Sequence, residues 1–441
     1  MTTTTAANTP STNSPAPAWV LPSLALCMLL PSLAVSSANV ALPTLAQAFG
    51  EPFAAVQWVV LAFLLATTAL IVAAGRLGDL VGRRRLLLAG IALFTLASAA
   101  CAVAPSLPTL IAARAAQGVG AAAMMALTLA FVGDAVPKAH TGRAMGLLGT
   151  MSAVGTALGP SLGGLLIAGL GWRALFAVNL PLGLLALGLA WRVLPAAPTA
   201  PRRAGLDLPG AALLALTLAV YALAMTRHLG LLPLAALGLA AFIGVEARAA
   251  SPLLKLERLR DRALSASLAM NALVSTVMMA TLVVGPFHLS RQLGLGAAAV
   301  GAWMSVGPLT SALSGMPAGR LVDRFGPQSM ARLGLMAVAA GCALIGVLPA
   351  TLGVLAYVGP LVIVTPGYAL FQAANNTAVM AGVAGDERGV IAGLLTLSRN
   401  LGLVTGASAM GALFAAAGLS ATFAVATGLA LFALALAKRA A

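Results

Sequence analysis

The sequence contains little charge and very little acid. Only 8% of its 441 residues are charged, and 10 aspartates and glutamates stand against 25 lysines and arginines. A soluble protein of this length needs far more polar surface than these residues can provide. The scarcity of charge therefore excludes the soluble globular class.

Cysteines and catalytic motifs are scarce as well. Cys27, Cys101 and Cys342 lie inside apolar runs without CxxC spacing, so we expect neither a disulfide nor a metal site. There is no HExxH motif and no phosphate-binding loop of the GxxxxGK type, and we expect no enzymatic activity and no cofactor. The net charge of +15 does not predict nucleic-acid binding, because the basic residues form no continuous patch.

What the sequence does contain is a series of apolar runs. Hydrophobic residues make up 61% of the chain, and a run of about 20 residues can cross ~30 Å of hydrocarbon as a helix. Strand-like alternation is absent, which argues against a membrane barrel. We predict an all-α polytopic membrane protein with fourteen transmembrane helices, at residues 19–46, 54–75, 86–105, 107–133, 143–168, 173–193, 208–226, 229–247, 263–289, 296–319, 329–349, 352–378, 388–412 and 416–437.

The placement of lysine and arginine predicts the orientation. With the N-terminus inside, Arg173, Arg227 and Arg291 fall in outer loops, and Arg114 and Arg399 fall within spans. The other 20 of the 25 basic residues then face the cytoplasm. Because cytoplasmic loops carry the excess of positive charge, we predict that both termini lie inside.

One charged segment occurs twice. Residues 75–85 read GRLGDLVGRRR and residues 319–326 read GRLVDRFG, with Asp79 and Asp323 separated by 244 positions. At about 31 residues for each span and loop, this separation corresponds to eight spans. We therefore predict two parallel six-helix repeats around an inserted pair. The expected parts are a disordered cytoplasmic tail (1–18), an N-terminal half (19–193), the inserted pair (208–247), a cytoplasmic linker (248–262) and a C-terminal half (263–437).

The repeated segment combines glycines, which permit tight turns, with charges that can pair near helix ends. We predict a latch that holds one of two conformations, and the alternative is a turn that only fixes topology. The residues of the predicted latch are Gly75, Asp79, Gly82, Arg83, Arg84, Gly319, Asp323, Arg324 and Gly326.

These motifs resemble those of the major facilitator superfamily. GRLGDLVGRRR is similar to the loop that follows the second helix, RAAQGVGAA (114–122) to a fourth-helix motif, and GTALGPSLGG (155–164) to a fifth-helix motif of antiporters. ANVALP (38–43), WRALFAVNLP (172–181) and SRNLG (398–402) are similar to segments of its fourteen-span drug:proton antiporters. The resemblance extends over residues 19–437. It implies proton-coupled alternating access between two helical halves.

Glycines recur every four residues in the fifth expected span. Gly155, Gly159 and Gly163 form a smooth stripe that lets another helix approach closely, and Pro160 bends the helix. The resemblance implies that this stripe is a gating interface between the halves. Ordinary helix packing is the alternative.

Arg114 is the most informative polar residue. Burying an arginine costs about 2.5–3.5 kcal/mol even on lenient insertion scales, so it must face a cavity or partners, and Gln117 lies next to it at i+3. The resemblance links this arginine to proton transfer, whereas a structural arginine is the alternative. Other polar residues of the spans predict a wet central cavity, and any of them can instead serve as a bond between helices: Asn39, Gln372, Asn375, Asn376, Arg399 and Asn400.

The chain departs from the drug:proton antiporters at one position. Ala34 occupies a first-helix position where these antiporters commonly carry an acid, and all ten acidic residues lie in loops or at span ends. Asp134 is the best remaining proton acceptor. A cavity with two arginines and no carboxylate disfavours permanently cationic substrates.

We therefore expect a monomeric multidrug exporter of the plasma or inner membrane, of a kind that confers antibiotic resistance. Its partners are the lipid bilayer, a neutral or anionic amphipathic small molecule, and protons. The alternative is an exporter or facilitator of a metabolite or organic anion without proton coupling.

Overall fold

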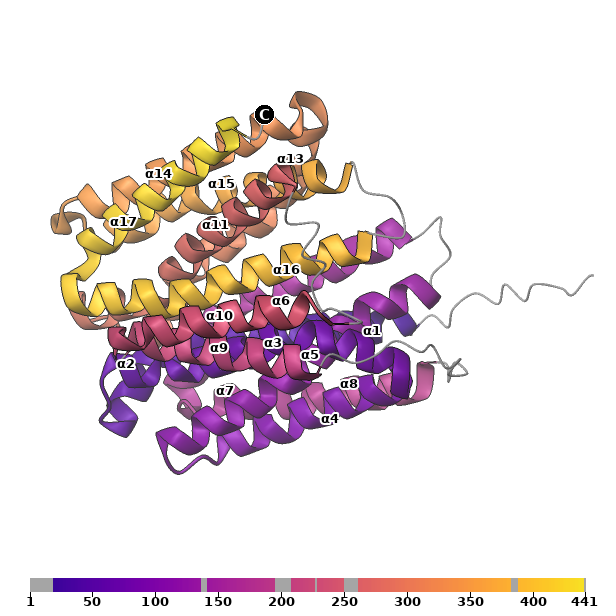
Figure 1. Ribbon diagram of the computed structural model, residues 1–441. Coiled ribbons are helices and arrows are strands. Elements are labelled where there is room, and N and C mark those ends of the chain that lie inside the picture. Colours follow the sequence, from indigo (N-terminus) through magenta and orange to yellow (C-terminus); the bar gives the residue numbers. More distant parts are fainter. Residues whose placement is uncertain are drawn as a thin grey trace, which may run out of the picture.

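The protein folds as a bundle of helices (Figure 1). The computed structural model describes residues 19–135, 141–194, 208–226, 228–249, 261–381 and 388–439, and these contain helices and no strand. The predicted tail and most of the predicted linker lie outside these ranges. In chain order the elements are α1 (Val20–Phe49), α2 (Phe53–Val56), α3 (Trp58–Val81), α4 (Arg83–Ala102), α5 (Leu107–Ala135), α6 (Thr141–Leu170), α7 (Ala174–Ala177), α8 (Asn179–Val193), α9 (Leu208–Thr226), η2 (Leu229–Leu231), α10 (Leu232–Glu246), α11 (Arg262–Phe287), η4 (His288–Gln292), α12 (Ala297–Met304), α13 (Val306–Phe325), α14 (Pro327–Val347), η5 (Ala350–Leu352), α15 (Val354–Ala381), α16 (Arg388–Thr405), η6 (Gly406–Met410) and α17 (Gly411–Arg439).

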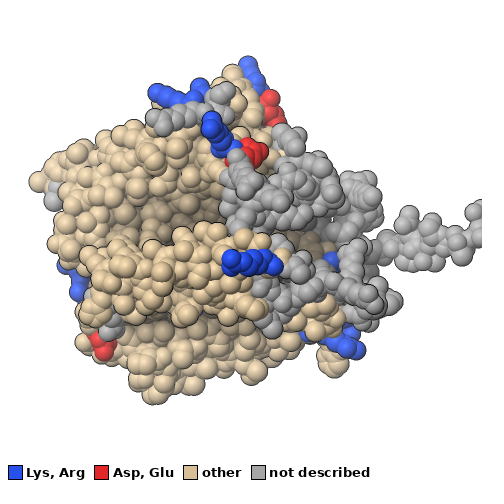
Figure 2. All heavy atoms as spheres, in the orientation of Figure 1, with Lys and Arg blue, Asp and Glu red and all other residues tan. Residues whose placement is uncertain are grey.

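Eleven helical segments of the described chain are long and apolar enough to cross a membrane. The apolar part of α6 is shorter, from Val154 to Leu170, and α12 and α13 are separated at Ser305. Charged side chains lie toward the two ends of the bundle, with a broad uncharged band between them (Figure 2). The chain is thus an all-helical membrane protein, while the count of fourteen spans and the orientation stay predictions.

Both copies of the repeated charged segment end a helix in the same way. α3 ends at Gly82 with φ of 98°, and α13 ends at Gly326 with φ of 83°, a region of backbone space that favours glycine. Gly75 and Gly319 instead lie inside the two helices, which continue beyond their apolar runs. A helix satisfies its own backbone in water as well as in lipid, so it need not end where the apolar run ends.

The helix pairings of the first part of the chain recur in the last part. α1 packs mainly on α6, as α11 packs on α16, and α4 packs on α5, as α14 packs on α15. Glycines bring the backbones of α4 and α5 close together, and they do the same for α14 and α15. A Cβ added at Gly120 would lie 2.6 Å from the Phe94 nitrogen, and one added at Gly334 would lie 2.7 Å from the Phe371 nitrogen. These recurring pairings support the predicted internal repeat.

Helices α9 and α10 pack on each other and, through α9, on α3. Only 17% of the residues in the segment that contains α10 are buried inside the protein, and Leu237 on it is 69% exposed. The Trp58 indole nitrogen donates to Thr226 Oγ1 of α9 at 3.2 Å, and Tyr221 Oη lies 3.3 Å from Thr405 Oγ1 of α16. The pair therefore lies at the periphery and touches both parts of the bundle.

Aromatic contacts define one end of the bundle, which we call the Gly50 end. The rings of Phe49 and Trp172 are 5.3 Å apart, close to Gly50, and the ring of His288 lies 5.6 Å from that of Tyr357. We call the opposite end the Gly82 end. There the Arg84 guanidinium donates from Nη2 to the carbonyl of Trp191 at the end of α8.

The glycine crossings predict a specific pattern of destabilisation. Gly159→Ala and Gly406→Ala place a methyl group against Ser36 and Met279, whereas a Cβ at Gly169 meets nothing within 4 Å. Overpacking costs about 1–3 kcal/mol, and alanine gains about 1 kcal/mol over glycine as a helix former. We expect the first two variants to melt at lower temperature in detergent. Gly169→Ala should melt at the wild-type temperature or above, and equal melting of all three variants would contradict close packing at the crossings.

Candidate functional site

The interior of the first half contains a hydrogen-bonded chain of polar groups centred on Arg114 of α5. Arg114 is fully buried; its Nε donates to the Val59 carbonyl of α3 at 2.9 Å, and its Nη1 donates to Gln117 Oε1. Gln117 Nε2 donates to Ser98 Oγ of α4 at 2.7 Å, and Ser98 Oγ donates to the Phe94 carbonyl at 2.7 Å. The arginine thus joins α3, α4 and α5 through neutral partners.

Aromatic rings complete the surroundings of the guanidinium. Its carbon lies 4.4 Å from the centre of the Phe63 ring and 5.9 Å from that of Phe176. Such ring faces attract a cation, most strongly where water is excluded. Arg114 Nη2 has no partner, and no carboxylate of the described residues pairs with this side chain. A charged donor is therefore available here for a further acceptor.

Asn39 is another residue of the predicted pathway with unsatisfied polar atoms. It lies on α1 with 1% of its surface exposed, and neither its amide nitrogen nor its amide oxygen has a partner. Buried polar groups are nearly always satisfied, so an unpaired amide marks a place where another group can bind. Asn39 and Arg114 are the predicted pathway residues of the first half with free polar atoms.

The predicted polar residues of the second half fall into two groups. Asn375 and Asn400 are buried, and Asn375 Nδ2 donates to the Ser267 carbonyl of α11 at 3.5 Å. Gln372 is partly buried and donates to Tyr368 Oη at 2.8 Å. Arg399 and Asn376 are exposed. No hydrogen bond that the structure describes connects these residues with the Arg114 network.

Two of the acidic residues predicted to be functional, Asp79 and Asp134, have side chains that lie outside the described part of the chain. In the second copy of the latch segment, Asp323 and Arg324 are exposed, and the Arg324 guanidinium lies 5.1 Å from the centre of the Phe325 ring.

The glycine stripe of α6 faces α1 of the same half. A Cβ added at Gly155 would lie 2.5 Å from the Leu29 carbonyl oxygen, and additions at Gly159 and Gly163 would meet Ser36 and Ser37. α6 contacts the second half through Gly164, which directly follows Gly163 of the stripe. A Cβ at Gly164 would lie 2.6 Å from the Ala297 carbonyl oxygen of α12.

Residues 159–163 match the G-x-S-x-G spacing of serine hydrolases. That motif exposes its serine on a sharp turn between a strand and a helix. Here Ser161 lies inside α6, and its hydroxyl donates to the Leu158 carbonyl at 3.2 Å. The match is therefore a consequence of helix packing.

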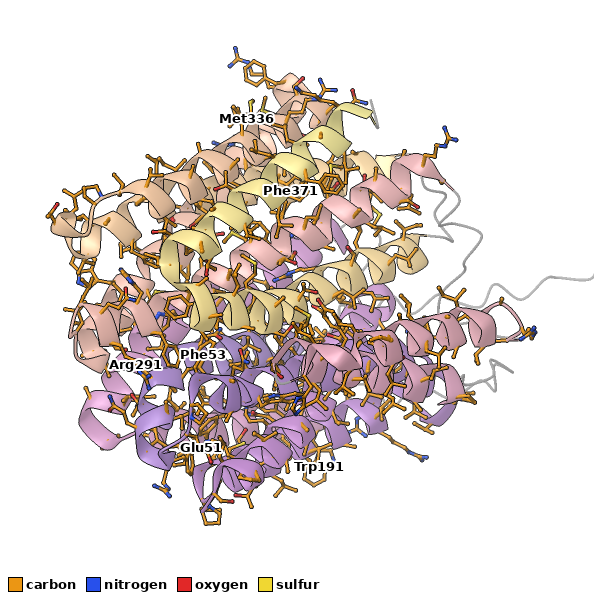
Figure 3. All side chains as sticks on the ribbon, turned by 60° about the vertical axis from the view of Figure 1, so that its left-hand side comes forward. Glu51, Phe53, Trp191, Arg291, Met336 and Phe371 are labelled. Atoms are coloured by element: carbon orange, nitrogen blue, oxygen red, sulfur yellow. The ribbon has the colours of Figure 1, made fainter. Side chains whose placement is uncertain are left out.

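Phenylalanines that the sequence motifs did not indicate join the halves at the Gly50 end. Figure 3 labels one of them, Phe53. The Phe53 ring of α2 lies edge-on to Phe287 of α11, with centres 4.5 Å apart, and 6.2 Å from Phe414 of α17. A Cβ at Gly411 would lie 2.7 Å from Gln57 Oε1. We call Phe53, Phe287 and Phe414 the aromatic contact. No sequence signal distinguishes them from other apolar residues near span ends.

Comparison with known proteins agrees with this arrangement. The family model of the Major Facilitator Superfamily matches residues 24–407. Multidrug resistance protein Stp of Mycobacterium tuberculosis is 33% identical over 376 residues, which are 82% of this chain and 70% of Stp. Multidrug efflux pump LfrA of Mycolicibacterium smegmatis is 32% identical over 410 residues, 90% of this chain and 81% of LfrA. Riboflavin transporter RibZ of Clostridioides difficile is 29% identical over 388 residues, 87% of this chain and 85% of RibZ.

Solved structures share the fold. The human organic anion transporter MFSD10 has a TM-score of 0.67 at 20% identity, covering 95% of this chain and 99% of its own. The peptide transporter POT has a TM-score of 0.72 at 16% identity, covering 95% and 94%. The curated relatives point to a transporter rather than an enzyme. The resemblance seen in the sequence motifs is confirmed: this chain is a multi-pass protein of the cell membrane and belongs to the major facilitator superfamily.

Proposed function

We propose that this protein exports neutral or anionic amphipathic compounds, of the drug type, by proton-coupled alternating access. The observation that carries the proposal is the buried Arg114 guanidinium, whose Nη2 is free and whose described partners are all neutral. The similarity to multidrug proteins of two mycobacteria supports drug-type transport. In this proposal the chain has fourteen spans with both termini in the cytoplasm.

The charge of the interior supports the proposed substrate class. The described carboxylates of Glu51, Asp261 and Asp323 are exposed at the ends of elements, and Glu246 ends the peripheral α10. A permanent cation in the centre would meet arginine without a counter-ion, and like charges repel each other strongly where the dielectric constant is low. An anionic or strongly polar acceptor can instead bind Arg114 Nη2.

The contacts between the halves support an outward-closed state. The aromatic contact and the Gly164 crossing both lie on the predicted outer side. Arg399 is exposed although it lies within the apolar segment Leu394–Lys438. Because exposure of arginine to lipid is costly, we assign Arg399 to a water-filled cavity between the halves, together with Asn376. The Gly82 and Gly326 turns would then move apart and together as the cavity opens and closes.

Proton coupling is assigned to Arg114 together with Asp134. Arg114 lies in the first third of α5 (Leu107–Ala135), and Asp134 lies at its end. Protonation of the acid would change the charge balance along one helix, and Arg114 would transmit this change to α3 through the Val59 carbonyl. The alternative is a metabolite or organic-anion transporter without coupling, and the similarity to a riboflavin transporter together with Ala34 favours it.

The proposed substrate class predicts how transport depends on the charge of the substrate. Fluorescein and rhodamine 123 have the same ring system and opposite charge, and we expect proteoliposomes containing pyranine to move protons in response to fluorescein only. Arg114→Ala should reduce this response at least about tenfold, because leaving buried partners unsatisfied costs about 1–3 kcal/mol. Arg114→Lys should also be impaired, since lysine lacks the forked donors. Arg173→Ala, on the surface at the Gly50 end, is the matched control.

Two results would contradict this assignment. A response to rhodamine 123 alone would overturn the anionic or neutral substrate class. Fluorescein flux without proton movement would establish the uncoupled alternative.

The proposed outward-closed state predicts that loss of the aromatic contact opens the Gly50 end. Phe53→Ala removes two ring contacts, each of about 0.5–1.5 kcal/mol, so the population open at the Gly50 end should rise about fivefold or more. Spin labels at the exposed positions Val103 and Thr351 would report it as a longer distance. Phe423→Ala, which removes a ring contact with Tyr357 inside the second half, should leave the distances unchanged. Identical distance distributions in Phe53→Ala and wild type would show that the aromatic contact does not hold this end closed.

A further inference from the structure

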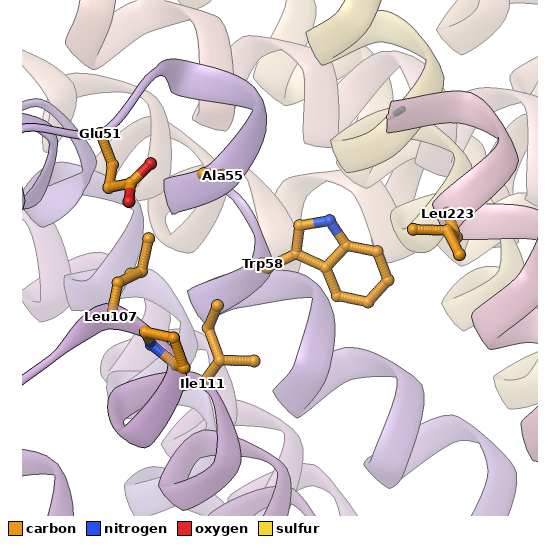
Figure 4. Close-up of a pocket in the computed structure, with 7 residues that line it drawn as sticks. Glu51, Ala55, Trp58, Leu107, Ile111 and Leu223 are labelled. Atoms are coloured by element: carbon orange, nitrogen blue, oxygen red, sulfur yellow. The ribbon is translucent and has the colours of Figure 1, made fainter. Parts of the chain in front are cut away.

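A pocket of about 370 Å³ lies at the Gly50 end (Figure 4). Its walls come from the loop after α1, from α2 and α3, from the start of α5 and from α9 of the peripheral pair. The lining residues are Glu51, Ala55, Trp58, Leu107, Pro108, Ile111 and Leu223.

Glu51 is the charged residue of this lining. It is exposed, and no described residue gives its carboxylate a hydrogen bond or an ion pair. The pocket therefore places an unpaired negative charge beside an otherwise apolar wall. In Figure 4 Ala55 lies between Glu51 and Trp58, Leu107 and Ile111 lie below them, and the Trp58 indole extends toward the side of Leu223.

Trp58 supplies an oriented aromatic face. Its indole nitrogen is held by Thr226 Oγ1 at 3.2 Å, which fixes the ring between α3 and α9. An indole face attracts ammonium groups, and the attraction adds to that of a carboxylate nearby. A carboxylate and an indole around one opening are therefore chemically suited to an ammonium ion.

The position of the pocket indicates that the ligand also has an apolar tail. Trp58 begins the long helix α3, and tryptophan at the start of a span lies at the level of the lipid headgroups. Leu223 contributes a wall from α9, whose partner α10 is largely exposed to lipid. A ligand with its ammonium between Glu51 and Trp58 can extend its apolar part directly into the bilayer.

We propose that this pocket binds the headgroup of an ammonium-bearing phospholipid of the phosphatidylethanolamine class. The lipid joins the peripheral pair α9–α10 to α3 and α5, at a place separate from the transport pathway. The site does not depend on the proposed substrate or on proton coupling. A free amphipathic amine shares the same chemistry and is distinguished by the test.

The test measures lipid retained by the purified full-length protein. The protein is extracted from bilayers containing equal amounts of phosphatidylethanolamine and phosphatidylglycerol, and bound lipid is counted by native mass spectrometry. We expect phosphatidylethanolamine to be enriched at least fivefold. Glu51→Gln and Trp58→Leu should abolish the enrichment. Asp261→Asn removes an exposed carboxylate at the opposite end and keeps a capping side chain for α11, so it should preserve the enrichment.

Ala55→Leu provides an independent variant, since it fills the pocket and leaves both recognition groups in place. It should also abolish the enrichment. Equal retention of the two lipids by wild type, or enrichment that survives Glu51→Gln, would overturn the proposal. Binding of dodecylammonium without enrichment of phosphatidylethanolamine would assign the pocket to free amines and overturn the lipid assignment.

Discussion

The absence of water inside the bilayer is the constraint on which this structure depends. Every backbone group must find its partner within the protein, so the described chain is helical throughout its apolar runs. Helices in lipid gain no hydrophobic stabilisation when they associate, so close packing must hold them together. Gly120 and Gly334 allow such packing, because each lies where a side chain would collide with the next helix. The same kind of glycine crossing recurs in the α4–α5 pair and in the α14–α15 pair.

The same constraint explains where charge is placed. Arg114 can remain in the interior because a carbonyl, an amide and two aromatic rings surround it. Glu51 lies at the edge, where water and headgroups are within reach. The interior therefore carries an available positive group and the periphery an available negative one. In the two proposals above, this separation would let one protein select a substrate and a lipid by opposite charges.

Much of the architecture could be predicted because it follows from local patterns. Apolar runs located the helices, and the repeated glycine-ended segment predicted two turns that the structure shows at Gly82 and Gly326. The i+3 spacing of Arg114 and Gln117 predicted that they are neighbours, and they are hydrogen-bonded. The helix breaks at Gln57 and Ser305 were missed, since neither lies at a proline or glycine. The sequence patterns also did not predict which face of each helix packs against the other half of the protein.

The sequence by itself determined the class of protein, the family and the residues with unusual chemistry, because composition, hydropathy and motif spacing are properties of the chain. Only the tertiary structure decided which partners these residues meet. It turned the Gly155 stripe toward α1, brought Phe53 against Phe287, and assembled the pocket of Glu51 and Trp58 from segments as distant as Leu223. The physical reason is that almost every residue of an apolar helix is compatible with either lipid or protein. The choice between them is made by the shapes of the neighbouring helices.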